Sequence, residues 1–435
     1  MSLVVAVAVV AVAGNVVRFL DRPRFTAQDV RASASSPVPP AFLPLPELDR
    51  LIGEFERRVE DGGTTLDLGF LGALYLDRAR ATGDIADHER AERALTSALD
   101  RHPGDVAAAI LLAGARQSRH DFTGALDIAG KVLRADPGHL GANAAAGDAH
   151  LALGDHAAAA RSFAALEAAA PDNPSVLVRR AEVARIEGDN DEALRLAGRA
   201  AETVPLHRRR EAGFYRAFAA QLAFDVGDLA VADEQAAAAV DLDPHSPAAL
   251  AVLARTRAAG GAWREAIGLY EEATAAVPHP TYLGELGDLY TLTGDEERAA
   301  AAYDTVAVIA RLSPTIYDRQ LARFYADHDI EAAAAVKITS AMLAVRHDVD
   351  GYDAHAWALY RAGDLAPARA ASDLALALGT RSAPMLYHAG LISAALGDTA
   401  RAADELAAAL AINPGFSPLQ AVEARRVLEE MGGAS

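Results

Sequence analysis

The segment Leu283–Asp295, which reads LGELGDLYTLTGD, decides the fold, because its closing Gly-Asp dipeptide returns along the chain at a nearly constant interval. We call this the turn dipeptide. Its first residues are Gly83, His120, Gly154, Gly188, Gly227, Gly261, Gly294, His328, Gly363 and Gly397, spaced by 37, 34, 34, 39, 34, 33, 34, 35 and 34 residues. The second residue is Asp in every copy except the sixth, which has Ala262. A period near 34 predicts stacked helix-turn-helix units.

The chemistry of each copy fits two helices joined by a tight turn. Glycine adopts the left-handed conformation that ends a helix, and the Asp that follows can cap the next one. Five residues after the start of most copies comes a small residue that lets two helices cross closely. These are Ala125, Ala159, Ala193, Ala232, Ala266, Ala299, Ala333, Ala368 and Ala402. Prolines that stop the second helix follow at Pro137, Pro171, Pro205, Pro244, Pro278 and Pro414.

This combination of Leu-Gly before the turn, Gly-Asp within it, then Ala and Pro resembles the tetratricopeptide repeat. The resemblance covers roughly residues 65–414, and its clearest copies are Leu283–Asp295 and the final stretch Gly390–Pro414. It implies an all-α, right-handed superhelical solenoid of about ten repeats, and we expect one elongated domain because each unit of a solenoid contacts only its neighbours.

The composition of the chain excludes several classes of function. The chain has 435 residues and no cysteine, so it has no disulfide, thiolate metal site or cysteine nucleophile. Its formal charge of −19 argues against a nucleic-acid partner, since such proteins present basic surfaces to phosphates. The sequence also lacks a nucleophile elbow, a phosphate-binding glycine loop, a His-Glu-x-x-His zinc motif and a dinucleotide fingerprint. We therefore expect neither an enzyme nor a cofactor.

The N-terminus differs in kind from the repeats. Ser2–Gly14 is an uncharged apolar run ending in Ala-Val-Ala, which is typical of a secretory signal. No basic residue precedes it, however, and Arg18, Arg22 and Arg24 follow it, which would favour a retained segment with its downstream side in the cytoplasm. We expect residues 1–25 to be a signal peptide or membrane anchor, with possible membrane attachment through residues 2–17. The protein is then exported or anchored at the cell envelope; the alternative is a cytoplasmic protein.

Three further segments flank the repeats. Residues 26–46 carry five prolines and several serines, which predicts an extended linker. Residues 47–64 contain an amphipathic helix that would cap the first repeat, with Leu48, Leu51, Ile52, Phe55 and Val59 on one face. Residues 415–435 contain the expected C-terminal capping helix, with Leu419, Val422, Val427 and Leu428 on its apolar side.

In the tetratricopeptide family the first helix of each unit lines a concave groove, so the resemblance implies that partner-binding residues lie on these helices. The predicted groove residues are Arg179, Glu182, Arg185, Gln221, Arg255, Asp288, Arg323, Asp353, Trp357, Tyr360, Tyr387 and His388. Their mixture of charges and aromatic rings suits a peptide or protein surface. We expect Trp357, Tyr360 and Tyr387 to be anchors and Arg179, Arg185 and Arg255 to select by charge.

A metal site is the weaker interpretation of residues 347–355, HDVDGYDAH, with His388 one repeat later. Three Asp and two His could supply ligands, but the twelve-residue calcium loop would need an acid where Leu359 stands. We instead expect Asp348 and Asp350 to cap a helix and His355 to pack against its neighbour. The sequence thus predicts a non-catalytic protein–protein interaction scaffold of the cell envelope. The alternatives are a cytoplasmic regulatory or assembly adaptor and, less favoured, a metal-binding accessory protein.

Overall fold

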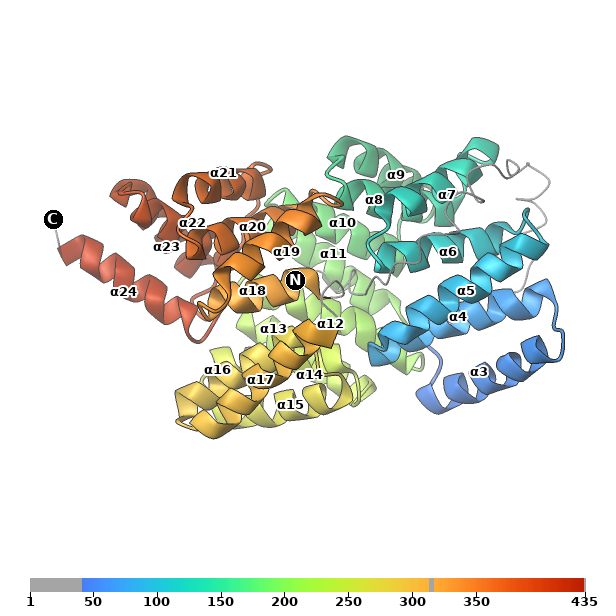
Figure 1. Ribbon diagram of the computed structural model, residues 1–435, viewed down its shortest axis with the longest axis horizontal. Coiled ribbons are helices and arrows are strands. Elements are labelled where there is room, and N and C mark those ends of the chain that lie inside the picture. Colours follow the sequence, from blue (N-terminus) through green and yellow to red (C-terminus); the bar gives the residue numbers. More distant parts are fainter. Residues whose placement is uncertain (1–40, 313–316, 434–435) are drawn as a thin grey trace. The chain divides into compact units, whose positions relative to one another are not determined.

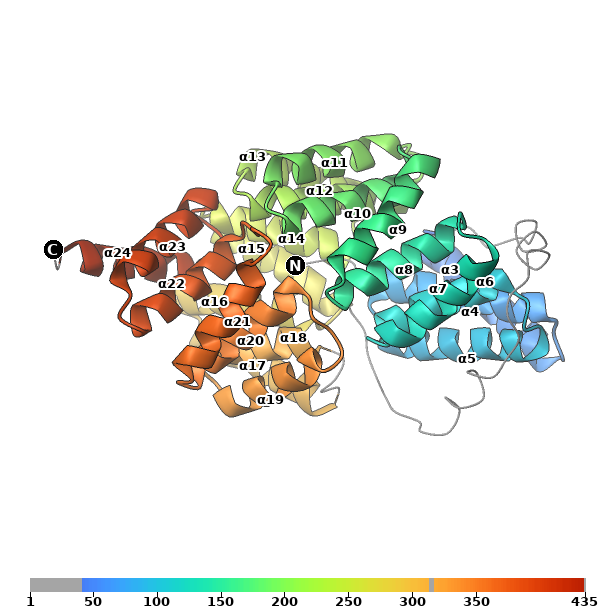
Figure 2. The same ribbon diagram turned by 90° about the horizontal axis from the view of Figure 1, so that it is seen from above.

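The computed structural model describes residues 41–312 and 317–433, and every regular element in these two ranges is an α-helix. Figure 1 shows that helices that follow one another in the chain pack side by side as antiparallel pairs, and Figure 2 shows the same helices from above. The described residues fall into two compact units that adjoin in sequence at Pro171 and Asp172. We call residues 41–171 the N-terminal unit and residues 172–433 the C-terminal unit. The expected single elongated domain is therefore divided into two.

The N-terminal unit contains a capping helix and three helix pairs. Its elements are α3 (Leu45–Glu60), α4 (Thr65–Thr82) with α5 (Ile85–Arg101), α6 (Val106–Ser118) with α7 (Phe122–Ala135), and α8 (Leu140–Ala152) with α9 (His156–Ala169). Helix α3 buries Leu48 and Ile52, two residues of its predicted apolar face, against the first pair. The predicted segments 1–25 and most of 26–46 lie outside the described residues.

The C-terminal unit contains seven pairs and a closing helix. The pairs are α10 (Pro174–Ile186) with α11 (Asn190–Thr203), α12 (Arg209–Asp225) with α13 (Leu229–Leu242), α14 (Pro247–Ala259) with α15 (Trp263–Ala276), α16 (Pro280–Thr293) with α17 (Glu296–Leu312), α18 (Asp318–Asp327) with α19 (Ala332–Leu343), α20 (Val349–Arg361) with α21 (Leu365–Leu376), and α22 (Ala383–Ala395) with α23 (Thr399–Ile412), followed by α24 (Gln420–Gly433). Ten pairs thus follow one another between residues 65 and 412, as the turn dipeptides predict.

The turns form as their chemistry requires. All eight glycines of the turn dipeptides have φ between +68° and +83°, and His120 reaches the same region at +61°. Seven of the following Asp side chains accept a backbone N–H of the next helix: Asp84, Asp121, Asp155, Asp189, Asp228, Asp295 and Asp398. These caps satisfy donors that a helix start otherwise leaves unpaired.

The eighth pair departs from the expected pattern. Its left-handed residues are Asp329 and Glu331, so α19 begins two residues later than its counterparts. As a result Ala333 is exposed and Ala335 is fully buried, and the prediction that Ala333 lies at the helix crossing is wrong. The other eight predicted alanines are at most 2% exposed.

The two ends of the chain differ in how far the structure tests what the sequence predicts. In α24 Ala421 and Ala424 are buried, and the predicted Val427 and Leu428 pack partly buried against the same core, whereas Val422 is 56% exposed. The predicted apolar face is therefore right in part. Among residues 41–312 and 317–433, no helix combines the length and apolarity needed to span a bilayer. The predicted attachment segment, residues 2–17, lies outside these ranges and stays a prediction.

Candidate partner-binding surfaces

None of the twelve predicted groove residues is freely exposed. Glu182, Arg185, Gln221, Asp353, Trp357, Tyr387 and His388 are buried, and the remaining five are half-buried. All twelve lie on first helices of the C-terminal unit, as the repeat pattern predicts. The structure brings most of them into three internal clusters. Partner binding by these side chains is untested and stays a prediction.

The first cluster surrounds Arg255 on α14. Its guanidinium donates to both carboxylate oxygens of Glu285, at 2.8 Å each, and to Gln221 Oε1 at 2.5 Å. Tyr270 donates its hydroxyl proton to the same carboxylate at 2.7 Å. Burial, followed by the charge of Glu285, raises the pKa of Tyr270 well above its ordinary value. A bidentate pair of this kind fixes the geometry of three consecutive first helices.

The second cluster joins α10, α18 and α20. Arg185 donates to Glu182 at 2.7 Å and to Asp350 at 3.3 Å, and Arg319 lies 3.6 Å from the same Asp350 oxygen. Burial alone would raise the pKa of Asp350, but the positive charges of Arg185 and Arg319 outweigh burial and lower it. The carboxylate is therefore held charged between two arginines from helices far apart in the sequence.

The third cluster contains the predicted aromatic anchors. Trp357 is 0% exposed, and its indole N–H donates to Asp327 at 2.8 Å. Its ring stacks on His388 at 4.3 Å between centroids, and His388 Nδ1 lies 2.8 Å from Asp353 Oδ1. Tyr387 is 2% exposed. Trp357 and Tyr387 therefore present almost no surface to a partner, because neighbouring helices already cover them.

Contacts between residues about 190 positions apart close the C-terminal unit on itself. Thr380 donates its hydroxyl proton to the carbonyl oxygen of Ile186 at 2.5 Å, and Asn413 Nδ2 donates to that of Phe224 at 2.5 Å. A methyl group on Gly188 would lie 2.1 Å from Gly379 O, and one on Gly227 would lie 2.2 Å from Ile412 O. We call these contacts the closure. They bring the turns of α10–α13 against segments that follow α21 and α23.

The residues of the metal interpretation are used structurally. Asp348 caps α20 by accepting the N–H of Gly351 at 2.6 Å, and it binds Arg346 at 2.5 Å. His355 Nδ1 lies 2.8 Å from the Thr339 hydroxyl, on the neighbouring helix. Within the described ranges no group of three or more His, Cys, Asp or Glu side chains is arranged to hold a metal ion.

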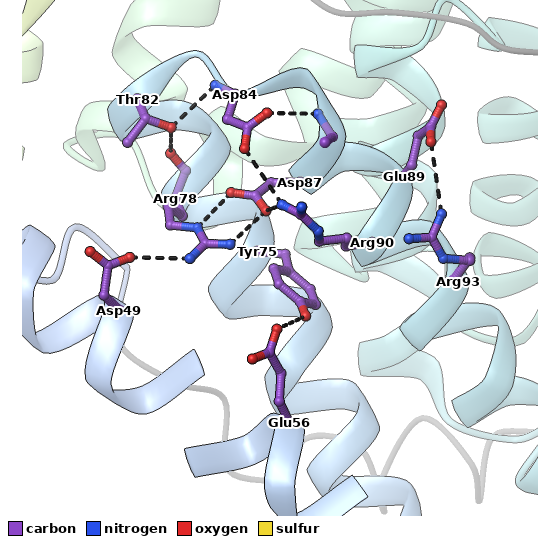
Figure 3. A network of polar contacts seen from close by, with 11 residues as sticks. Asp49, Glu56, Tyr75, Arg78, Thr82, Asp84, Asp87, Glu89, Arg90 and Arg93 are labelled. Carbon is purple, nitrogen blue, oxygen red and sulfur yellow. Dashed lines mark hydrogen bonds and ion pairs between the residues drawn. The ribbon is translucent and has the colours of Figure 1, made fainter. Parts of the chain in front are cut away.

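The N-terminal unit has its own polar network (Figure 3). Arg78 on α4 lies between two carboxylates, donating to Asp87 on α5 at 2.6 Å and to Asp49 on α3 at 3.1 Å. Asp87 is 0% exposed and also accepts from Arg90 at 2.6 Å, while Tyr75 donates to Glu56 on α3 at 2.6 Å. These contacts attach the capping helix to the first repeat pair, and the two arginines balance the negative charge of the buried Asp87.

An open surface depression of about 900 Å³ lies at the turns of the α14–α15 and α16–α17 pairs. Its lining includes Trp263, Ile267 and Thr293, with Arg264, Asp295 and Arg298 at the charged positions. Trp263 is 39% exposed, in contrast to the buried Trp357. The sequence marks this turn, because Ala262 is the only second residue of a turn dipeptide that is not Asp.

Sequence reasoning missed several residues that matter in these clusters. Glu285, Arg319 and Arg346 compensate buried charges, and Thr380 and Asn413 make the closure. The repeat period places a residue on a first helix, but it does not say which distant helix that residue faces. Only Trp263 had a local sign in the sequence, because it follows Ala262, which replaces the Asp of the turn dipeptide.

Family models for the tetratricopeptide repeat match four segments of the chain. One model matches residues 117–181, and a second matches residues 76–139, 219–278 and 252–314. No curated protein matches the sequence.

Solved structures with a similar arrangement include three repeat proteins. A human IFIT1 dimer with m7Gppp-AAAA is 13% identical, with a TM-score of 0.47, and the match covers 88% of this chain and 99% of that one. Pseudomonas aeruginosa PilF is 18% identical, with a TM-score of 0.39 and coverages of 51% and 97%. A tetratricopeptide repeat protein from Parabacteroides merdae is 16% identical, with a TM-score of 0.34 and coverages of 60% and 98%. These likenesses are limited to the helical architecture.

The matched segments fall on helix pairs in both units, from α4 to α17. They coincide with the turns that the glycine and aspartate residues build. The chain therefore contains tetratricopeptide repeats, which imply a protein–protein interaction scaffold.

Proposed function

We propose that this protein is a non-catalytic scaffold that binds a protein partner through exposed surface at the turns of its C-terminal unit. The observation that carries the proposal is the contrast between two tryptophans of the C-terminal unit. Trp357 lies in a closed internal cluster, whereas Trp263 borders an open depression. A large aromatic side chain on an open surface offers contact area at low entropic cost.

The internal clusters support this choice of surface. Arg185, Arg255 and Trp357 already have partners within the unit, so a ligand that bound to them would have to replace hydrogen bonds that are satisfied. Breaking a buried, charged hydrogen bond is costly. A partner would meet no such cost at the turns, where the side chains are hydrated.

The proposal includes a location at the cell envelope. It rests on the uncharged run Ser2–Gly14 and its Ala-Val-Ala end. Fractionation of cells, with sequencing of the N-terminus of the mature protein, tests this part. Recovery in the envelope fraction, with or without cleavage after Ala13, is expected; a soluble cytosolic protein with its first residues intact would contradict it.

Scaffolding itself is tested by crosslinking in cells. A photoreactive amino acid is placed at Arg264, beside the depression, or at Arg199, which lies on the second helix of another pair. We expect a discrete protein adduct from the first position only. The adducted protein, once purified, should bind the full chain saturably. A protein that crosslinks equally from both positions, or that fails to bind when purified, would argue against a specific scaffold.

A further inference from the structure

At the depression beside Trp263 the turn dipeptide lacks its Asp, and the surface around it is open. In the other nine turn dipeptides the second residue is Asp, which in most pairs caps the second helix; here Ala262 occupies that position and makes no side-chain cap. Losing such a cap destabilises a helix start. The cap is nevertheless missing at the helix start where Trp263, Arg264 and Ile267 line the open surface.

Charges around the depression are unevenly compensated. Asp295 binds Arg298 at 2.6 Å, and Arg298 also lies 3.2 Å from Glu271. Glu265 lies 3.2 Å from Arg257. Arg264 is exposed and has no hydrogen-bond or ion-pair partner in the part of the chain that the structure describes. The acids of this surface are therefore paired with cations of the chain, and one cation is left available.

We propose that this depression, which we call the Trp263 site, binds an acidic segment of a protein partner. A carboxylate of the segment would pair with Arg264, in the turn where the repeat's own Asp is missing. An adjacent aliphatic or aromatic side chain would pack on Trp263 and Ile267. The inference rests on the proposed scaffold function and specifies the chemistry of its partner. Charge complementarity selects this occupant over a basic one, because a basic segment would meet the unpaired Arg264.

Peptide selection on the full-length protein tests the site. A library of short random peptides is displayed on phage and selected on the parent protein. Selected peptides are then synthesised with a dye, each beside a version whose acidic residue is replaced by the matching amide. Binding is measured by fluorescence anisotropy. The variants are Ala262→Asp, which supplies an internal carboxylate, together with Trp263→Ala and Arg264→Glu.

Asp228→Ala provides the matched control. Asp228 caps α13 in the preceding pair by accepting the N–H of Val231 at 3.1 Å, so this variant loses a cap without touching the Trp263 site. Circular dichroism confirms that every variant is folded before its binding is measured. A general effect of turn stability on binding would appear in Asp228→Ala as well as in Ala262→Asp.

The selected peptides should share an acidic residue beside an apolar one. Their affinity should fall about tenfold or more in the amide versions and in all three site variants, and it should be unchanged in Asp228→Ala. Peptides without an acidic residue, or with affinities insensitive to Ala262→Asp and Arg264→Glu, would overturn the inference. So would sedimentation showing that the parent is a dimer and Trp263→Ala a monomer, because the site would then bind a second copy.

The outcomes also separate this inference from the scaffold function. If no peptide is selected while a purified partner still binds saturably to the full chain, the partner's chemistry has been wrongly assigned and the scaffold stands. If neither binds, both fail. The two readouts use different probes, so one result does not decide the other.

Discussion

The residue after the turn glycine has opposite consequences in different repeats. Where it is Asp, its side chain in most copies accepts an N–H from the first turn of the second helix. Where it is Ala262, no side chain caps the start of α15. One side chain therefore decides whether the second helix of this pair begins with a side-chain cap.

Replacing Ala262 with Asp should stabilise the protein. The new carboxylate can cap α15 as Asp228 caps α13, which is worth about 1 kcal/mol in free energy of unfolding. Urea unfolding monitored by circular dichroism measures the change, and Asp228→Ala should shift the midpoint the opposite way. An Ala262→Asp protein that is no more stable than the parent would show that geometry at this turn prevents capping.

His279 should make stability depend on pH. Burial, together with the positive charge of Arg255, lowers the pKa of His279 to about 4, against an ordinary 6.5. The neutral ring is required because its Nδ1 accepts the N–H of Thr281 at 3.3 Å. The unfolded chain therefore takes up the proton first as pH falls. Stability from this group is complete above pH 6.5 and is lost between pH 6.5 and 4.

The His279→Asn variant tests this sign. Asn can still cap α16 but does not titrate, so the fall in unfolding free energy between pH 7 and pH 4 should shrink by about 3 kcal/mol. His88, whose pKa burial also lowers to about 4, would keep part of the dependence. Urea midpoints at a series of pH values supply the measurement. If the unfolding free energy fell equally steeply with pH in the parent and the variant, the pKa of His279 would not be lowered by folding.

At the scale of the element, close helix crossings depend on residues without bulk. Gly147 and Gly287 occupy equivalent positions seven residues before their turns, and an added methyl group would lie 2.3 Å from the Phe163 ring and 2.2 Å from the Tyr303 ring. The second ring cannot move easily, since its hydroxyl donates to Asp288 at 2.8 Å.

Gly287→Ala should therefore lower the free energy of unfolding by about 1–3 kcal/mol, the usual cost of overpacking. Gly268→Ala is the matched control, because nothing lies within 4 Å of a methyl group added there. Gly268 is on α15, where Ala has the better helix propensity, so the control should be neutral or slightly stabilising. Equal losses in the two variants would point to a backbone effect in place of a steric one.

The elements were largely predictable from local chemistry, and the site was not. Glycine conformation, Asp caps and prolines act within a few residues, so the positions of ten turns follow from the sequence. Ala333 was misplaced because two non-glycine residues of that turn, Asp329 and Glu331, adopt left-handed backbone. Burial of Trp357 and pairing of Arg185 with Asp350 depend on which helices meet after many small rotations between pairs, which no local pattern encodes.

At the scale of the whole molecule, the C-terminal unit differs from a solenoid in which each repeat contacts only its neighbours. The closure adds hydrogen bonds between segments about 190 residues apart, including Thr380 to Ile186 and Asn413 to Phe224. Distant pairs should then unfold together more than nearest-neighbour coupling alone allows.

Asn413→Ala should loosen both ends of this contact. Asn413 is 0% exposed, and removing its amide should cost about 1–3 kcal/mol. Hydrogen exchange should accelerate at the ends of both α12 and α23. Asn173→Ala, which removes the exposed cap of α10, should affect α10 alone. Faster exchange confined to α23 in the first variant would indicate that the two segments are not coupled.

Closure of the C-terminal unit is the central claim, since it accounts for the pairing of Arg185 on α10 with Asp350 on α20. The chain has no cysteine, so spin labels can be attached specifically to Glu187→Cys and Arg381→Cys, two exposed positions beside the contact of Asn190 with the carbonyl oxygen of Arg381. Electron–electron double resonance on the doubly labelled protein should give one narrow distribution of short distances between the two spin labels. A broad or long distribution would mean that the unit is open in solution and that Arg185 is not paired with Asp350.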